Sequence, residues 1–300
     1  MLTGILAGLA AGALWGLVFV APRMTVGLSS VDLAAGRFVS YGAVAALVML
    51  ITWRSHKLPS ARQALAALGL SVLGFTGYYL LLVLAIQRAG TELPTLIIGT
   101  IPIWVMLLGK PLGLKWTALL PGLVLTAAGL LLMMNATPAA DQAAPVPSDG
   151  NYWQGVAFAL AAMLCWTAFA ILNAAWLKRH PQVNATEWAN WLGIATGVGA
   201  VLLWLVAGSE SRALLANENI GFSVVVCIAT GVGSAWLATI LWNIASQRLS
   251  ASLCGQLIVS ETLFALLYSF AWDRAWPGAL QLLAAVLFTL GILASIRAHQ

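Results

Sequence analysis

The chain has 300 residues, of which 61% are hydrophobic and only 8% are charged. Because a soluble domain carries about 25% charged residues, the 14 basic and 9 acidic side chains are too few to cover a chain of this length in water. The composition therefore excludes a soluble protein, and the net charge of +5 falls in short, interrupted groups that do not indicate a nucleic-acid binder.

Ten apolar stretches follow one another along the chain, separated by charged and turn residues. Each is close to the length of about 20 residues that a helix needs to cross a bilayer core. They are Leu2–Ala21, Val31–Trp53, Ala64–Gln87, Leu93–Gly109, Trp116–Asn135, Tyr152–Leu177, Glu187–Gly208, Phe222–Gln247, Ala251–Trp272 and Ala275–Ile296. The sequence therefore predicts an all-α, polytopic membrane protein with ten transmembrane helices, of which the fourth is short and holds Pro94 and Pro102.

The basic residues predict the orientation of these helices, because Lys and Arg accumulate in cytoplasmic connections. With the N-terminus inside, the inside connections hold nine basic residues: Arg54, Lys57, Arg62, Lys110, Lys115, Lys178, Arg179, Arg248 and Arg297. The outside set holds five: Arg23, Arg37, Arg88, Arg212 and Arg274. The excess predicts a multi-pass membrane protein with both termini in the cytoplasm, although Arg23 opposes this orientation locally.

The segment Ala136–Gly150 is the one real linker in the sequence. Its Pro, Asp and Ala content, without a basic residue, is typical of a flexible loop outside the cell. Because the linker divides the ten stretches five and five, we expect a first five-helix repeat over residues 1–135, an external linker over 136–151 and a second five-helix repeat over 152–300.

The two halves resemble each other in sequence. Five residues recur at an offset of 151: Gly4, Leu9, Ala10, Ala11 and Trp15 as Gly155, Leu160, Ala161, Ala162 and Trp166. AIQRAGTEL (85–93) matches ASQRLSASL (245–253), and Asp32 corresponds to Glu187. Because each half has an odd number of spans, the second repeat is inverted relative to the first. Inverted repeats are typical of secondary transporters, which expose one site alternately to either side of the membrane.

The sequence also resembles a known family. The Ala13-Leu14-Trp15-Gly16 motif, the duplicated five-span unit and the Gln-Arg connections resemble the bacterial drug/metabolite transporter superfamily, EamA-type, and Trp242-Asn243 resembles the aromatic amino acid exporters within it. The resemblance implies a central cavity lined by spans one, three, four, six, eight and nine, with spans five and ten at the periphery. The sequence departs from the family at Glu261-Thr262, where many relatives have Glu-Pro, and this puts a helix break there in doubt.

Aromatic and polar side chains deep in the spans are candidates for lining that cavity. Ring faces suit an aromatic or apolar substrate, and deep Tyr and Trp side chains need a partner for their polar hydrogen. The candidate substrate-binding residues are Trp15, Tyr78, Tyr79, Thr100, Trp166, Asn173, Trp242, Asn243 and Gln256. Trp15 and Trp166 are favoured because they occupy equivalent places in the two halves. The alternatives are core packing or lipid contact for the rings, and interhelical hydrogen bonds for the polar side chains.

Two further sets of residues have a predicted structural role. The tryptophans near span ends are expected to anchor the protein at the membrane interface: Trp53, Trp116, Trp153, Trp188 and Trp276. Four glycines on one face of the first span, Gly4, Gly8, Gly12 and Gly16, predict close packing of a neighbouring helix. The alternative for this glycine face is a surface along which one bundle slides past another.

Glu261 is the acidic residue at mid-membrane. An ionised carboxylate there costs at least about 2.5–3.5 kcal/mol on insertion scales, so Glu261 is expected to face a wet cavity or to be protonated. The functional hypothesis is a coupling residue that carries a proton, or the partner of a substrate ammonium group. The alternative is a carboxyl group hydrogen-bonded to a neighbouring helix. Because the sequence places no Lys or Arg at this depth, phosphorylated substrates lack an anchoring cation.

The motifs favour transport over catalysis. The chain has no phosphate-binding Gly-rich loop, no metal-ligand pattern among its histidines and cysteines, and no grouped catalytic residues at depth, so we expect no cofactor, no metal and no enzymatic activity. The favoured function is export of amino acids, aromatic or otherwise apolar, across the cell inner membrane by alternating access. The alternative is efflux of lipophilic cations or other small metabolites, and an intramembrane enzyme is a third hypothesis. The expected partners are a small-molecule substrate and the lipid bilayer, with no obligate protein partner evident.

Overall fold

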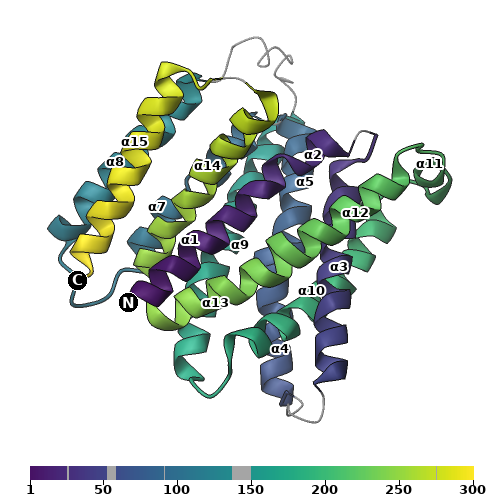
Figure 1. Ribbon diagram of the computed structural model, residues 1–300, viewed down its shortest axis with the longest axis horizontal. Helices are drawn as coiled ribbons and strands as arrows, with labels where there is room; N and C mark the ends of the chain where they lie inside the picture. Colours follow the sequence, from purple (N-terminus) through teal and green to yellow (C-terminus); the bar gives the residue numbers. More distant parts are fainter. Residues whose placement is uncertain (26, 53–58, 91, 137–149, 275) are drawn as a thin grey trace.

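The computed structural model describes residues 1–25, 27–52, 59–90, 92–136, 150–274 and 276–300, and these residues form a bundle of helices without strands (Figure 1). The helices are α1 (Leu2–Gly16), α2 (Ala21–Met24), α3 (Ser30–Ile51), α4 (Ala61–Ser71), α5 (Gly77–Ala89), α6 (Glu92–Gly99), α7 (Ile101–Leu108), α8 (Trp116–Ala136), α9 (Gly150–Arg179), α10 (Ala185–Ala207), α11 (Ser211–Leu215), α12 (Ile220–Thr230), α13 (Ala238–Arg248), α14 (Ala251–Asp273) and α15 (Ala279–Ala298).

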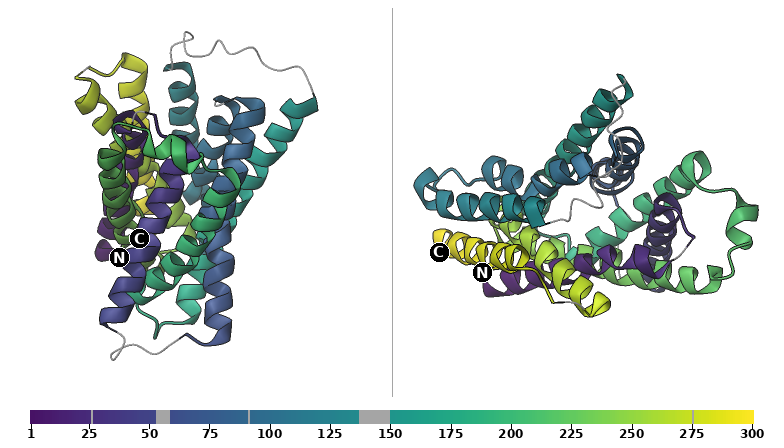
Figure 2. Two further views of the ribbon diagram at one scale, coloured as in Figure 1. Left: turned by 90° about the vertical axis from the view of Figure 1, so that its right-hand side faces the viewer. Right: turned by 90° about the horizontal axis from the view of Figure 1, so that it is seen from above.

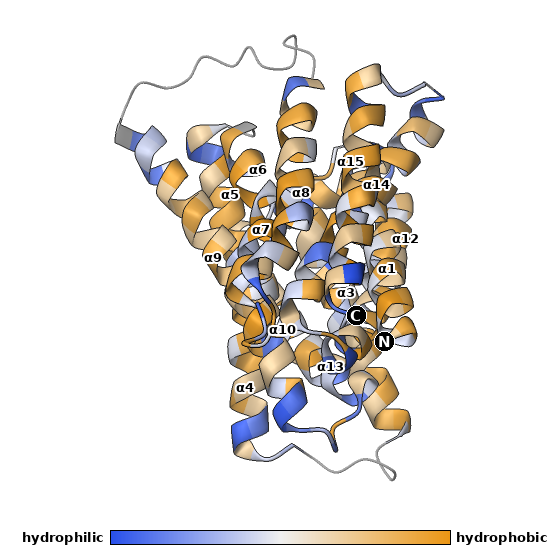
Figure 3. Ribbon diagram, turned by 90° about the vertical axis from the view of Figure 1, so that its left-hand side faces the viewer, coloured by the Kyte–Doolittle hydropathy of each residue, from blue (hydrophilic) through white to orange (hydrophobic). Residues whose placement is uncertain are grey.

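These helices confirm the prediction of an all-α, polytopic membrane protein. Within the described residues, 9 helical runs are long and apolar enough to cross a membrane, and Leu93–Leu108 is a shorter apolar helix. Figure 3 shows hydrophobic residues around the middle of the bundle and hydrophilic residues gathered toward its ends. Most of the predicted linker (137–149), Trp53 and Ala275 lie outside the described residues.

Four of the predicted spans are built from more than one regular segment, and in the first of them a 3-10 helix, Leu17–Phe19, follows α1. A π-helical segment, Val72–Thr76, joins α4 to α5, and a second one, Gly231–Leu237, joins α12 to α13. The short fourth span breaks at Thr100, where Pro102 sits in the first turn of α7. Because π-helical segments are rare and frequently occur at functional sites, the third and eighth spans are of particular interest.

Side-chain caps explain where several helices begin. The side chain of Ser29 accepts a hydrogen bond of 3.1 Å from Asp32 N at the start of α3. The side chain of Asn184 accepts one of 2.9 Å from Glu187 N at the start of α10. Such caps satisfy backbone N–H groups that have no partner inside the helix. Asp32 and Glu187, which correspond in the two halves of the sequence, therefore hold the same position in two capped helices.

Glycines allow the closest helix contacts. A Cβ atom built on Gly8 would lie 2.6 Å from Leu257 Cδ1, so the glycine face of α1 packs directly on α14. This contact supports the packing interpretation of that face. A Cβ atom on Gly42 would lie 2.7 Å from Gly197 Cα, so α3 and α10 cross backbone to backbone. Small residues permit such approaches between membrane helices.

The strongest helix pairings join distant parts of the chain. α3 packs on α10, α8 on α15, α5 on α9, α7 on α14, and α1 on both α13 and α14. α8 and α15 lie side by side at one edge of the bundle, and the two chain ends lie near each other (Figures 1 and 2). The centre of the bundle is therefore built mainly from α1, α5, α7, α9, α13 and α14.

One of the predicted interfacial anchors is wrong. Trp188 is fully buried, stacks on Trp176 with the ring centroids 3.5 Å apart, and donates a hydrogen bond of 2.7 Å to Asn173 Oδ1. The prediction fails because a position near the end of a span does not reveal which way the side chain faces. The side chain of Trp188 points inward, between α9 and α10. Trp116, Trp153 and Trp276 are exposed, as expected of anchors.

Candidate substrate site

Three tryptophans from three helices meet at the centre of the bundle, and we call them the tryptophan triad: Trp15 of α1, Trp166 of α9 and Trp242 of α13. The ring centroids are 6.2 Å apart for Trp15 and Trp166, 5.3 Å for Trp15 and Trp242, and 6.2 Å for Trp166 and Trp242. These separations are typical of interacting aromatic pairs. The structure thus brings together three of the predicted substrate-binding residues.

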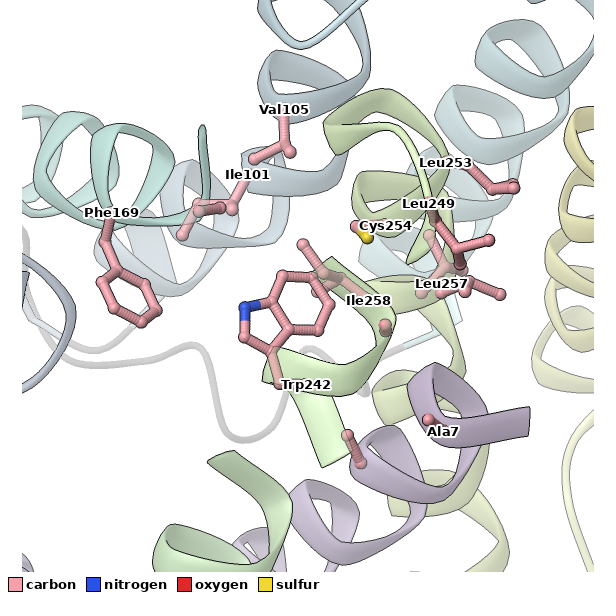
Figure 4. Close-up of a cluster of buried hydrophobic side chains, with 14 of the residues drawn as sticks. Ala7, Ile101, Val105, Phe169, Trp242, Leu249, Leu253, Cys254, Leu257 and Ile258 are labelled. Carbon is pink, nitrogen blue, oxygen red and sulfur yellow. The ribbon is translucent and has the colours of Figure 1, made fainter. Parts of the chain in front are cut away.

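Trp242 is the most enclosed member of the triad. It is 1% exposed, whereas Trp15 and Trp166 are partly exposed, and Figure 4 shows it among Ile101, Ile258 and Cys254. Its indole N–H is buried and has no hydrogen-bond partner in the described part of the chain. Leaving a buried donor unpaired costs about 1–3 kcal/mol, so such a group indicates a position where a ligand or a water molecule supplies the acceptor.

A chain of aromatic contacts leads away from the triad. Trp166 contacts Phe169 at 6.0 Å, Phe169 contacts Phe75 at 5.4 Å, and Phe75 contacts Phe38 at 5.9 Å between ring centroids. Phe38 in turn contacts Tyr79 at 6.0 Å. These phenylalanines were not among the predicted site residues, because an isolated Phe in an apolar helix gives no sign in the sequence of which way it faces.

Arg37 lies at the far end of this aromatic chain. Together with Tyr79 and Leu33 it lines a small pocket of about 50 Å³ between α2, α3 and α5. The guanidinium carbon is 4.6 Å from the centroid of the Phe38 ring, and Nε is buried without a hydrogen-bond partner among the described residues. Arg37 is close enough to the carboxyl group of Glu261 for their charges to interact.

The position of Arg37 corrects two predictions. It was assigned to an outside connection, but α3 begins at Ser30, so Arg37 lies seven residues into the helix, about 10 Å along its axis. The expectation that no Lys or Arg lies at depth is therefore wrong. Counting charges by the nearest connection missed Arg37, although the residue falls inside the predicted second span.

Glu261 lies in the middle of α14, which continues through Thr262 without a break. A Cβ atom built on Gly12 would lie 3.1 Å from Glu261 N, so this turn of α14 packs against the part of α1 that carries Trp15. Glu261 is partly exposed, and its carboxylate makes no hydrogen bond and no salt bridge within 4.0 Å to another described residue. The alternative of a carboxyl group hydrogen-bonded to a neighbouring helix is therefore not observed.

Asn173 and Asn243 pair with each other beside the triad. Asn173 Nδ2 donates to Asn243 Oδ1 at 3.0 Å, and Asn243 Nδ2 donates to the carbonyl of Ala185 at 3.3 Å. Both asparagines are fully buried. Their hydrogen bonds hold α9, α10 and α13 together, and so position the helices that carry Trp166 and Trp242.

The remaining predicted residues lie in different surroundings. Gln256 is fully buried and bonds to Thr126 of α8 and Ser295 of α15, so it faces the peripheral helix pair. Thr100 donates to the carbonyl of Ile97 at 2.6 Å at the break in the fourth span. Tyr78 packs against the same core as Trp15 and Trp166, and Tyr79 donates to the carbonyl of Ser30 at 3.1 Å.

The chain is similar to known membrane proteins. Residues 2–135 match the EamA-like transporter family. The whole chain is 29% identical over 310 residues to Inner membrane protein YtfF of Escherichia coli (strain K12), covering 99% of this chain and 96% of that protein. A crystal structure of a protein that is 20% identical has the same fold, with a TM-score of 0.77 over 98% of both chains. The resemblance found in the sequence is thus confirmed, by the match of residues 2–135 to the EamA-like transporter family and by the similarity of the whole chain to YtfF.

Proposed function

We propose that this protein exports amino acids with aromatic or other apolar side chains across the inner membrane by alternating access. The observation that carries the proposal is the tryptophan triad, which places ring faces from both halves of the chain at the centre of the bundle. Ring faces bind a flat apolar side chain, and the unpaired N–H of Trp242 offers a hydrogen-bond donor for a polar atom of the substrate. The proposed substrate site comprises the triad with Tyr78 and Glu261.

Alternating access rests on two inverted repeats, residues 1–135 and 152–300, joined by the linker 136–151. The helix pairings support this arrangement, because the second span packs on the seventh, the fourth on the ninth and the fifth on the tenth. The contact of α5 with α9 has its counterpart in that of α13 with α1. The π-helical segments interrupt the third and eighth spans, which are also equivalent. A pseudo-twofold axis in the membrane plane would produce these pairings.

The orientation and the membrane are proposed from charge and similarity. With Arg37 inside a helix, the outside connections keep four of the five basic residues first assigned to them, against nine inside. The larger excess of basic residues in the inside connections favours both termini in the cytoplasm. The inner membrane is the location named for the similar protein YtfF.

Glu261 supports coupling to the proton gradient. Its carboxylate lies at mid-membrane without a hydrogen bond or salt bridge to the described residues, so it is free to bind either a proton or a substrate ammonium group. If protons enter from outside and are released inside as the repeats move, substrate travels in the opposite direction. Efflux of lipophilic cations is the less favoured function, because the positive charge of Arg37 acts on the same region.

Counterflow of labelled phenylalanine into proteoliposomes tests the proposal. Replacing Trp15 or Trp166 by Ala should lower the affinity for phenylalanine about 2- to 10-fold from the lost ring contacts alone. Replacing the exposed Trp116 or Trp276 by Ala serves as the matched control and should leave the affinity unchanged. If purified wild-type protein shows no counterflow of any aromatic amino acid, the proposed function is wrong.

A further inference from the structure

Arg37 is a partly buried cation whose guanidinium group has no anionic partner among the described residues. An arginine side chain carries five N–H donors and keeps its charge, so burial without an anion is costly. Arg37 forms no salt bridge within 4.0 Å to any residue that the structure describes, and its Nε has no acceptor. It makes a cation–π contact with Phe38, whose ring centroid lies 4.6 Å from the guanidinium carbon. The described part of the chain therefore does not supply the anion that this guanidinium group needs.

The surroundings connect this cation to the substrate site. Arg37 lines a pocket with Tyr79, and the aromatic chain of Phe38, Phe75 and Phe169 leads from it to Trp166. Arg37 is thus linked to the tryptophan triad by an unbroken series of ring contacts.

A second, opposite charge acts on the same region. Glu261 interacts electrostatically with Arg37, but the two do not form a direct salt bridge, so their charged groups stay more than 4.0 Å apart. Two opposite charges that are separated rather than paired match a ligand with one positive and one negative group. An α-amino acid is such a ligand, whereas a lipophilic cation would satisfy Glu261 and leave Arg37 unpaired.

We propose that Arg37 binds the carboxylate of a zwitterionic amino acid whose ammonium group faces Glu261, and that this contact makes the transporter reject ligands without a carboxylate. The inference rests on the proposed function and adds its specificity-determining residue. A guanidinium presents two parallel N–H donors to a carboxylate, which is a strong and directional contact. Because an analogue without the carboxylate leaves buried donors unpaired, it is rejected more strongly than one that merely differs in apolar size.

Competition experiments with reconstituted protein test the inference. Counterflow of labelled phenylalanine is measured against three unlabelled competitors: phenylalanine, 2-phenylethylamine, which lacks the carboxylate, and 3-phenylpropionate, which lacks the amine. In the wild type, 2-phenylethylamine should compete at least about 10- to 100-fold more weakly than phenylalanine. In Arg37→Gln the affinity for phenylalanine should fall about 10- to 100-fold, while that for 2-phenylethylamine changes little. The ratio of the two affinities within one variant does not depend on how much protein is folded.

Two further variants make the result specific. Arg37→Lys keeps the charge but not the paired donors, so it should retain part of the discrimination, and it carries the test if Arg37→Gln does not fold. Arg212→Gln, on the exposed surface of α11, is the matched control and should behave as the wild type. A wild type that transports phenylalanine but accepts 2-phenylethylamine equally well overturns the inference and leaves the proposed function intact. Unchanged discrimination in both Arg37 variants overturns it too, and a wild type without amino acid counterflow overturns both.

Discussion

The unpaired N–H of Trp242 yields a prediction in which stability and binding change differently. Trp242 and Trp188 are both buried, at 1% and 0% exposure, but Trp188 donates to Asn173 at 2.7 Å while Trp242 has no partner in the described chain. Replacing either by Phe removes a similar volume from the core, so the cost of the cavity should be similar. Trp188→Phe also leaves Asn173 Oδ1 without this donor, whereas Trp242→Phe breaks no hydrogen bond.

The expected difference follows from the hydrogen bond alone. Leaving one buried polar group unpaired costs about 1–3 kcal/mol in water-soluble proteins, and interhelical hydrogen bonds in membranes average about 0.6 kcal/mol. We therefore expect Trp188→Phe to be less stable than Trp242→Phe by about 0.6–3 kcal/mol. Unfolding in mixed detergent micelles, followed for both variants in parallel, measures this difference.

The binding assay should rank the same two variants in the opposite order. Trp242→Phe removes the donor offered to substrate and should weaken phenylalanine binding about 2- to 10-fold, while Trp188→Phe should leave the affinity unchanged. If Trp242→Phe is destabilised as much as Trp188→Phe, the N–H of Trp242 has a partner in the free protein. The reasoning from its unpaired donor would then be refuted.

Three further predictions address packing, coupling and topology. Gly42→Ala should lower the stability by about 1–3 kcal/mol, because its Cβ would lie 2.7 Å from a backbone atom. Gly69→Ala, whose Cβ would have nothing within 4 Å, should leave the stability unchanged, and thermal unfolding compares the two variants. Glu261→Gln should abolish the response of transport to an imposed pH gradient in proteoliposomes and leave downhill movement, and a wild type that ignores the gradient would contradict coupling. In intact cells an impermeant maleimide should label Glu218→Cys but not Gln182→Cys, and the reverse pattern would invert the proposed orientation.

The sequence was sufficient to predict the helices and part of the candidate site. Charged residues that interrupt the apolar stretches locate the ends of the spans, because lipid excludes charged residues. Pro94 and Pro102 indicate that the fourth span is broken. Trp15 and Trp166 were predicted together because they match between the halves, and their rings lie 6.2 Å apart. The sequence match between the two halves therefore carried more information about the candidate site than the depth of any single residue.

The direction in which each side chain faces could not be predicted. Membrane helices are apolar on most faces, so periodicity does not distinguish the packed side from the lipid side. For this reason the sequence predicts Gln256 at the cavity, whereas in the structure it bonds to Thr126 and Ser295. The sequence likewise predicts an interfacial anchor at Trp188, whose side chain is buried. The depth of Arg37 was not predicted because each basic residue was counted with its nearest connection. Arg37 was therefore counted with an outside connection, although it falls inside the second span.

A structure of the protein in lipid nanodiscs with bound phenylalanine tests the central claim most directly. The account predicts that the phenyl ring contacts Trp15 and Trp166 and that the ammonium group faces Glu261. It also predicts that a carboxylate oxygen of the ligand accepts a hydrogen bond from the N–H of Trp242. Ligand density elsewhere in the bundle, with the three indole rings of the triad still packed on one another, would contradict it.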